Sequence, residues 1–173
     1  MGSRVKSRDV LRKVTEDDLP TFFEHQCDSV ATAMAVHKSR NRDDFMSHWH
    51  RVVLGNGDNE TRTILVGDRA AGYVGSWEQD GKRLVAYWIG RDYWGQGIAT
   101  AALREFLATH EHRRPIHAYV ARSNTRSIQV LEKCGFQPVR NPGTKPDDEV
   151  EALFILDSAS SVAPPLTHGI ERS

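Results

Sequence analysis

A glycine-rich stretch at residues 93–100, with the sequence YWGQGIAT, places the strongest constraint on how this chain folds. It follows an aromatic run with strand character and opens an amphipathic helix. Glycine adopts backbone conformations that side chains forbid, which suits Gly95 and Gly97 to a tight turn. The N-terminus of a helix exposes unpaired N–H groups and the positive end of the helix dipole. We therefore expect a strand–turn–helix junction that binds a phosphate or pyrophosphate.

The composition is that of one globular domain. The chain has 173 residues, 39% of them hydrophobic and 27% charged, and its formal net charge is zero. This balance disfavours a broad nucleic-acid surface, and no apolar run approaches the roughly 20 residues that span a bilayer. The two cysteines, Cys27 and Cys134, make no disulfide scaffold, and the first residues contain no apolar signal region. We expect a cytoplasmic protein without nucleic-acid or membrane partners.

The first half of the chain predicts a strand, helices and then consecutive antiparallel strands. A strand is expected at residues 8–14. A helix is expected from an N-cap at Thr15, with Pro20 in its first turn, to about Cys27. Further helical segments are expected between residues 29 and 54, interrupted near Asn41. Strands follow at residues 61–66, 71–78 and 84–89. Asp80 and Gly81 form a strong two-residue hairpin signal between the last two of these strands.

The second half alternates helices and strands. The helix that starts at Ile98 places its apolar residues on one stripe. A buried strand is expected at residues 116–120 and a second amphipathic helix at residues 124–134, ended by Gly135. Strands are then expected at residues 136–140 and 150–156. The small residues and prolines from about Ser158 onward predict a mobile tail.

Two sequence blocks, in this order, resemble the GNAT superfamily of acetyl-CoA-dependent N-acetyltransferases. The first block is YWIGRDYWGQGIAT at residues 87–100, followed by Ala102 and Leu103, and the second is NTRSIQVLEKCGF at residues 124–136. Within the superfamily the chain is most similar to the branch of ribosomal-protein N-terminal (alanine) acetyltransferases. With their flanking elements, the blocks imply a GNAT-like domain at residues 8–157, with flexible termini at 1–7 and 158–173.

The resemblance implies an α+β fold, an α/β sandwich with a mixed, mostly antiparallel central sheet of about six to seven strands and about four helices. It implies an N-acetyltransferase that moves an acetyl group from acetyl-CoA to a primary amine, by direct attack in a ternary complex and without a metal. The acceptor is then a small-molecule amine or a protein N-terminus. We expect a monomer or a homodimer.

The resemblance also assigns residues to coenzyme A. In the family, the glycine loop and the helix start bind the pyrophosphate, chiefly through backbone N–H groups. The matching residues here are Gly95, Gln96, Gly97, Ile98, Ala99 and Thr100. The preceding strand pairs with the pantetheine arm, and one of its N–H groups would stabilise the tetrahedral oxyanion. The matching residues on this strand are Trp88, Ile89 and Gly90.

Two residues of the second block match positions near the pantetheine arm. Asn124 matches an asparagine that contacts the arm, although it also suits a helix N-cap. Ser127 matches a serine that is proposed to lie near the sulfur, where its hydroxyl would protonate or solvate the departing thiolate. A tyrosine that many members carry four residues before the Gly-Phe pair is Leu131 here, which weakens a mechanism with tyrosine as the acid.

The sequence offers several candidates for the general base and does not select one. An ammonium substrate must lose a proton before it attacks, so a carboxylate, a histidine or a water chain is needed near the thioester. Glu78, Glu149 and Glu151 are the candidate carboxylates, and His117 is a weaker candidate.

The cationic contact to the phosphates is also left open. Many members have Arg or Gln where this chain has Trp94, and the similar branch often has Lys where this chain has Gln96. Arg91 or Arg126 would have to supply the positive charge instead. With the tyrosine and an obvious base both absent, the alternative to an enzyme is a catalytically silent domain that binds an acyl-CoA as a sensor or assembly module.

Overall fold

Seven strands and five helices make up the described part of this computed structural model, which covers residues 10–35, 38–140 and 150–158. The strands are β1 (Leu11–Lys13), β2 (Glu60–Val66), β3 (Arg69–Gln79), β4 (Lys82–Ile89), β5 (Ile116–Ala121), β6 (Gln137–Pro138) and β7 (Glu151–Leu156). The helices are α1 (Leu19–Cys27), α2 (Ser29–Met34), α3 (Arg42–His48), α4 (Ile98–Thr109) and α5 (Thr125–Lys133). Short 3-10 turns lie at Glu16–Asp18 and Arg91–Tyr93, and a π-helical turn lies at Trp49–Val53.

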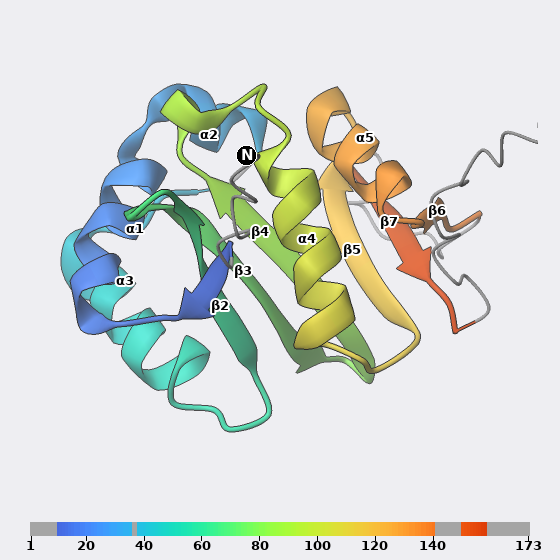
Figure 1. Ribbon diagram of the computed structural model, residues 1–173, viewed down its shortest axis with the longest axis horizontal. Helices are drawn as coiled ribbons and strands as arrows, with labels where there is room; N and C mark the ends of the chain where they lie inside the picture. Colours follow the sequence, from blue (N-terminus) through green and yellow to red (C-terminus); the bar gives the residue numbers. More distant parts are fainter. Residues whose placement is uncertain (1–9, 36–37, 141–149, 159–173) are drawn as a thin grey trace, which may run out of the picture.

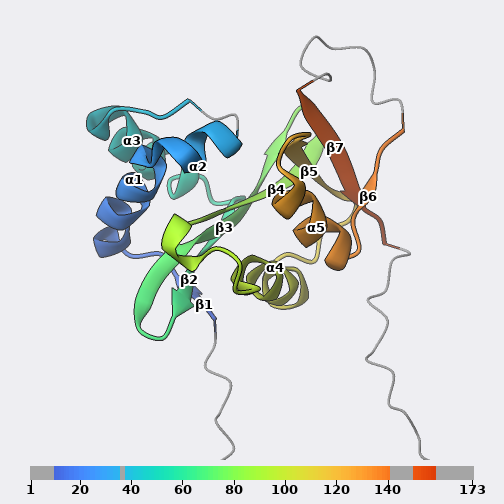
Figure 2. The same ribbon diagram turned by 90° about the horizontal axis from the view of Figure 1, so that it is seen from above.

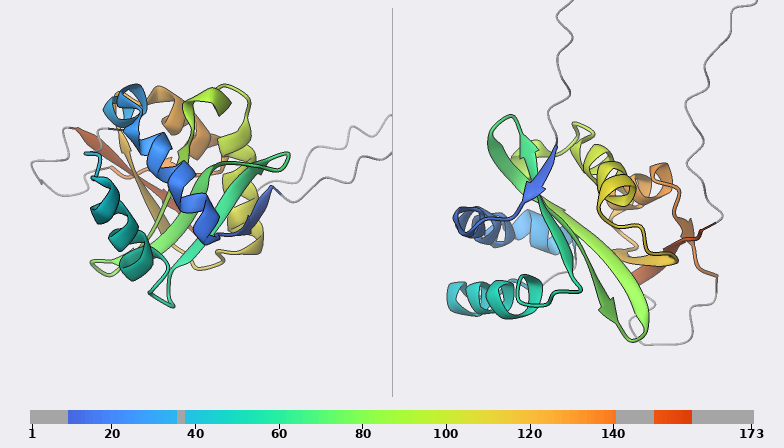
Figure 3. Two further views of the ribbon diagram at one scale, coloured as in Figure 1. Left: turned by 90° about the vertical axis from the view of Figure 1, so that its left-hand side faces the viewer. Right: turned by 60° about the horizontal axis from the view of Figure 1, so that its bottom comes forward.

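The strands form one sheet in the order β1-β2-β3-β4-β5-β7-β6 (Figure 1). Helices α1, α2 and α3 lie on one side of this sheet, and α4 and α5 lie on the other (Figure 2). The right-hand view in Figure 3 shows the same separation, with β2, β3 and β4 between the two groups of helices. All neighbouring strands are antiparallel except β4 and β5. The predicted α+β fold with a mixed, mostly antiparallel sheet is confirmed.

Most predicted elements occur, with differences at their ends. The helical region after residue 29 splits into α2, α3 and the π-helical turn, and the side chain of Asn41 caps α3 by accepting from the N–H of Asp44 at 2.8 Å. The strand expected at residues 136–140 is only Gln137–Pro138, although the N–H of Val139 still donates to the carbonyl of Leu153 at 2.8 Å. The first expected strand is described only as Leu11–Lys13, because residues 8 and 9 lie outside the described range.

Each side of the sheet has its own apolar core. The larger core joins the sheet to α4 and α5, and Val85 and Ile89 of β4 belong to it together with Ile116 of β5. The smaller core joins the sheet to α1 and α3; there Phe22 packs on Trp49 with ring centroids 5.1 Å apart. Since side chains alternate along a strand, these contacts define an α4–α5 face and an α1–α3 face for every central strand.

Among the described strands one pair is parallel, β4 and β5, and its pairing is very short. Arg83 pairs with Ile116 and Leu84 pairs with His117, and the β4–β5 ladder contains no further residue pair. From Val85 onward β4 pairs with β3 alone. The two strands therefore separate toward their C-terminal ends. We call this gap, between residues 85–89 of β4 and residues 118–121 of β5, the strand split.

A buried ionic cluster lies at the closed end of the strand split. The carboxylate of Glu111, which is fully buried, accepts hydrogen bonds from Nε of Arg83 at 2.9 Å and from the hydroxyl of Ser76. Nε of Arg113 donates to its other oxygen, also at 2.9 Å. Glu111 follows α4, whereas Ser76 and Arg83 belong to β3 and β4. One carboxylate thus ties the β3–β4 hairpin to the segment that leads into β5.

Replacing Glu111 by glutamine tests this cluster. Arg83 would keep a buried charge without its carboxylate, so we expect the free energy of unfolding to fall by about 3 to 5 kcal/mol. Urea denaturation at neutral pH measures this change. The matched control is Glu132→Gln on the exposed side of α5, which should change the free energy by less than about 0.5 kcal/mol. Equal stability of the two variants would contradict the role of the cluster.

The same carboxylate should make stability depend on pH. Burial alone would raise the pKa of Glu111, but hydrogen bonds from Arg113, Ser76 and Arg83 outweigh burial and lower it from 4.5 to about 2. As the pH falls, the unfolded chain takes up the proton first. The stabilisation is therefore complete above the ordinary glutamate pKa and is lost as the pH falls toward 2. Denaturation at a series of acidic pH values should show a shallower loss for Glu111→Gln than for the wild type.

Candidate active site at the strand split

The glycine loop connects the open end of β4 to α4 in the predicted way. Gly95 and Gly97 have φ values of 74° and 73°, in the region that favours glycine. Indole Nε1 of Trp94 donates to the carbonyl of Ile89 at 2.9 Å, which folds the loop back onto the end of β4. Within the described part of the chain, no side chain caps the N-terminus of α4. The first N–H groups of this helix are thus available to an anion, as the sequence predicts.

The contacts of the loop distinguish between the two candidate cations. The guanidinium of Arg126, at the start of α5, lies over the ring of Trp94 at 5.7 Å from the centroid. Nε of Arg91 instead pairs with the carboxylate of Asp28 at 2.9 Å. Arg126 is therefore the better placed cation for a phosphate at the loop. Arg91 joins the loop to the start of α2.

Gly90, at the end of β4, lies against α1 with no room for a side chain. A Cβ atom at this position would lie 2.6 Å from Nε2 of His25, on α1. Trp88 and Ile89 precede it on β4, with Trp88 half-buried and Ile89 part of the α4–α5 core. The three residues that the sequence assigns to the pantetheine arm thus lie next to each other along the strand split.

A pair of hydroxyl groups joins β4 to α5 on the α4–α5 face of the sheet. The phenol oxygen of Tyr87, on β4, lies 2.6 Å from Oγ of Ser127, on α5. Burial raises the pKa of Tyr87 to about 12, which keeps its proton in place at neutral pH. Sequence reasoning selected Ser127 but missed Tyr87. The strand pattern of the sequence indicated this position, because side-chain alternation places Tyr87 with Val85 and Ile89 on the face that α5 covers.

Asn124 and Leu131 complete the description of α5. Oδ1 of Asn124 accepts from the N–H of Ser127 at 3.2 Å, so Asn124 is the N-cap of this helix. Its Nδ2 is the group that would contact a pantetheine carbonyl. Leu131, which stands at the usual tyrosine position, is part of the α4–α5 core and is 2% exposed.

The predicted carboxylate bases lie in different places. Glu78 is exposed on β3 opposite Arg83, at the end of β4 that is far from the glycine loop. Glu151 is the first residue of β7, is half-buried and pairs with Ala121 at the open end of the split. Glu149 lies outside the described residues. Only Glu151 among the described carboxylate candidates is next to the open end of the split.

His117 lies on β5 at the closed end of the strand split. It is the last residue of β5 that pairs with β4, opposite Leu84. Because Ile116 and Ala118 belong to the α4–α5 core, alternation directs His117 toward the α1–α3 face. Its Nδ1 atom is buried and has no hydrogen-bond partner among the described residues.

A cavity of about 510 Å³ adjoins the open end of the strand split. It lies between α2 and the loop that follows β5, and its lining residues are Ser29, Val30, Ala33, Met34 and Ser123. Ser123 directly precedes Asn124, the cap of α5. The cavity therefore lies beside the open end of the split.

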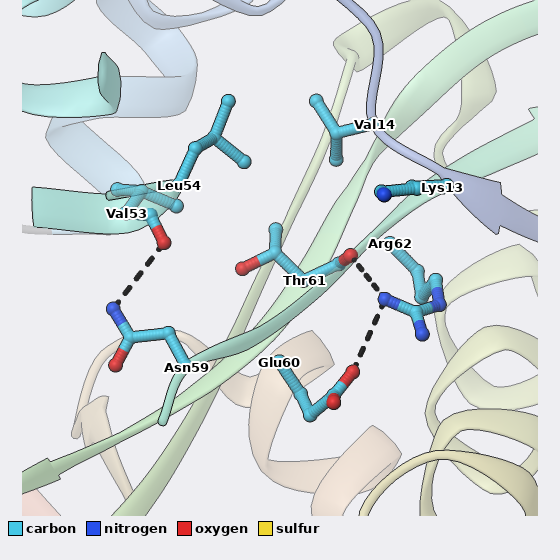
Figure 4. A pocket seen from close by; sticks show the side chains of 8 residues that line it. All are labelled: Lys13, Val14, Val53, Leu54, Asn59, Glu60, Thr61 and Arg62. Carbon is cyan, nitrogen blue, oxygen red and sulfur yellow. Dashed lines mark hydrogen bonds and ion pairs between the residues drawn. The ribbon is translucent and has the colours of Figure 1, made fainter. Parts of the chain in front are cut away.

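A separate cavity of about 290 Å³ lies between β1, β2 and the end of the π-helical turn (Figure 4). Its polar side chains pair with their own neighbours. Nη1 of Arg62 lies 3.1 Å from the carboxylate of Glu60, and Nδ2 of Asn59 donates to the carbonyl of Val53 at 3.3 Å. None of its lining residues comes from the glycine loop or the split. We therefore place the candidate site at the strand split.

Other sequence features have structural roles. Cys134 is buried, and burial raises the pKa of its thiol to about 11, which suits packing and not nucleophilic attack. Nε2 of His50 lies 2.8 Å from the carboxylate of Glu16. Within residues 10–35, 38–140 and 150–158, no cluster of three or more His, Cys, Asp or Glu side chains is arranged to hold a metal ion. No helix in these ranges is long and apolar enough to cross a bilayer.

Residues 8–137 match the family described as acetyltransferase (GNAT) domain. The chain therefore belongs to the GNAT acetyltransferase family, whose enzymes use acetyl-CoA as co-substrate. A search of curated proteins found no significant match.

Several solved structures share the fold. An aminoglycoside acetyltransferase AAC(6')-Ib in complex with coenzyme A superposes with a TM-score of 0.69 at 22% identity, covering 86% of this chain and 94% of that one. A spermidine N-acetyltransferase from Vibrio cholerae, in complex with CoA and spermine, has a TM-score of 0.69 at 13% identity and covers 85% and 94%. A GNAT-family acetyltransferase from Bacillus anthracis has a TM-score of 0.67 at 17% identity and covers 85% and 93%. These neighbours do not single out the ribosomal-protein branch.

A charge placed at Gly97 tests the glycine loop. Aspartate suits an N-cap, but its carboxylate would repel the pyrophosphate, so we expect Gly97→Asp to weaken CoA binding at least about tenfold, which is about 1.4 kcal/mol. Calorimetric titration with CoA measures this change. The isosteric control Gly97→Asn should bind more tightly than Gly97→Asp.

A second control separates charge at the loop from charge elsewhere. Gly67 also has a positive φ, 61°, and lies in the β2–β3 turn. Gly67→Asp introduces the same charge there and should leave CoA binding unchanged. Unchanged CoA binding by Gly97→Asp would contradict the assignment of the loop.

Proposed function

We propose that this protein is an N-acetyltransferase that transfers the acetyl group of acetyl-CoA directly to a primary amine, in a ternary complex and without a covalent intermediate. The observation that carries the proposal is the short pairing of β4 with β5, which ends at Leu84 and leaves the edge of β4 open as far as the glycine loop. An extended amide chain such as the pantetheine arm can pair with such an edge.

The donor would be held at two points. The pyrophosphate would bind the N–H groups at Gly95–Thr100, with Arg126 as the nearby cation. The pantetheine arm would run along β4 beside Trp88, Ile89 and Gly90, with Nδ2 of Asn124 on its other side. This arrangement directs the thioester toward the closed end of the split, where a β4 N–H would stabilise the oxyanion.

The leaving thiolate would be protonated from the α4–α5 face. Oγ of Ser127 is the proposed donor, and the phenol of Tyr87 is a positioning residue that holds it at 2.6 Å. The raised pKa of Tyr87 keeps a proton in this hydroxyl pair. The pair thus performs the part that a tyrosine at position 131 performs in many members of the superfamily.

The acceptor would bind on the opposite side, in the cavity beside α2. Its described lining is apolar apart from two serines and contains no carboxylate. Such a lining suits an amine that carries an apolar group better than a polycation. Both acceptor types of the sequence prediction, a small amine and a protein N-terminus such as that of a ribosomal protein, fit this description. Glu151 would attract the ammonium group from the edge of the cavity.

Release of free CoA thiol from acetyl-CoA tests the proposal. The amine panel should contain phenylethylamine, spermine, kanamycin and peptides with an N-terminal alanine, and acetylation is confirmed by mass spectrometry. We expect amine-dependent release, highest for an acceptor with an apolar group. Tight CoA binding with no release for any amine would contradict the proposal and favour an acyl-CoA sensor or assembly module.

The substitution Ser127→Ala tests whether the Ser127 hydroxyl protonates the leaving thiolate. Removing an acid that acts only in the transition state should lower kcat by about 10²-fold with little change in the KM for acetyl-CoA. Tyr87→Phe should lower kcat less, since Tyr87 acts through Ser127. The control Thr125→Ala, an exposed residue in the same helix turn, should keep wild-type kcat. A wild-type kcat for Ser127→Ala would contradict the assignment.

A further inference from the structure

We propose that His117 is the general base that removes the proton from the acceptor ammonium. This assignment rests on the proposed function. Three observations carry it: the residue lies at the closed end of the strand split, its side chain is on the acceptor side of the sheet, and its buried Nδ1 has no hydrogen-bond partner among the described residues. A buried polar atom without a partner is rare in folded proteins, and a bound substrate or water would supply the partner.

The position of His117 matches the place where the thioester must lie. A pantetheine arm that starts at the glycine loop and runs back along β4 ends near the point where β4 and β5 meet. His117 is the β5 residue at that point. On the same face of β4, the next position after Leu84 is Ala86, whose short side chain is exposed. An amine that enters from the α1–α3 side therefore reaches the thioester between Ala86 and His117.

The surroundings of His117 contain few competing groups. Its neighbours across the sheet are Leu84 on β4 and Ile155 on β7, both apolar. The titratable side chains that share its face are Lys82 of β4, Tyr119 of β5, Glu151 of β7 and Asp157 after β7. Lys82 and Asp157 lie beyond the closed end of the split.

Neither Glu78 nor Glu151, the described carboxylate candidates for the general base, lies at the closed end of the split on the acceptor side. Alternation from Ser76 and Arg83, which contact Glu111, places Glu78 on the α4–α5 face, away from the acceptor side. Glu151 is on the correct face, but its partner Ala121 is four residues beyond His117, roughly 13 Å along β5 at about 3.3 Å per residue. Glu151 is suited to hold the ammonium at the entrance, and His117 is suited to deprotonate it.

The proton and electron balance of the step is complete without a further reactant. The ammonium gives one proton to the imidazole of His117, directly or through one water, and becomes a neutral amine. Its nitrogen forms the new C–N bond while the carbonyl electron pair moves onto oxygen. Collapse of the oxyanion breaks the C–S bond, and the second nitrogen proton reaches the thiolate through the hydroxyl of Ser127. The imidazolium then releases its proton to solvent.

The experiment uses the full-length protein and the best acceptor of the amine panel. His117→Ala should lower kcat by about 10²-fold or more, with the CoA dissociation constant within twofold of wild type. Free imidazole added to the assay should restore part of the rate. The control His112→Ala, at an exposed position after α4, should keep the wild-type rate and should not respond to imidazole.

The outcomes separate this inference from the proposed function. If the wild type transfers no acetyl group to any amine, the proposed function fails. If the wild type is active and His117→Ala keeps more than half of its rate, the assignment of His117 is overturned. A rate loss that imidazole restores in neither His117→Ala nor His117→Gly also overturns it, because a purely structural role would give that result. His117→Gln, which preserves the side-chain volume, should lose the rate while retaining the thermal stability of the wild type.

Discussion

The buried carboxylate of Glu111 fixes the point at which β4 and β5 separate, and the geometry of the candidate site depends on that point. It binds Arg83, whose backbone belongs to the short parallel pairing, and Ser76 on the neighbouring strand β3. A fully buried charge is stable only when it is paired and hydrogen-bonded, so this cluster has a single arrangement. The β3–β4 hairpin is thereby held against the end of α4. Beyond this point β4 continues alone, with one edge open.

The two sides of the split provide complementary chemistry. Tyr87 and Ser127 meet on the α4–α5 face, where in the proposed mechanism they would protonate the leaving thiolate. His117 lies on the α1–α3 side at the closed end of the split, whereas the cavity at α2 adjoins the open end. A donor bound along β4 and an acceptor bound beside α2 would then approach the same point from opposite faces of the sheet. The proposed direct transfer between two bound substrates would use this separation, because no residue would have to carry the acetyl group.

The sequence was sufficient for the parts of the site that depend on local pattern. The glycine loop directly precedes the start of α4, and the Asn124 cap lies in a second short block, so residue type and spacing within each block predict them. Ser127 could be selected for the same reason, because it belongs to the same short block. The Asp80–Gly81 turn was predicted from two residues alone, and both have positive φ values.

Contacts between distant segments were beyond the sequence. Tyr87 and Ser127 are 40 residues apart, and their contact depends on how α5 packs on β4. The sequence alone predicts an exposed charge at Glu111, just after a helix. The fold shows that this side chain is buried together with Arg83 and Ser76. The importance of His117 depends on where the β4–β5 pairing ends, and no local pattern encodes that register. The branch-level resemblance did not identify the acceptor, because the segments around α2 contain no motif.

The most direct test of the central claim is a crystal structure of the protein with CoA bound. We expect a pyrophosphate within about 3.2 Å of backbone N–H groups in the segment Gly95–Thr100, as hydrogen bonding requires. We also expect the pantetheine arm along the open edge of β4, with its sulfur between Ser127 and His117. CoA bound at the cavity between β1 and β2, or a pantetheine arm that makes no contact with β4, would contradict it.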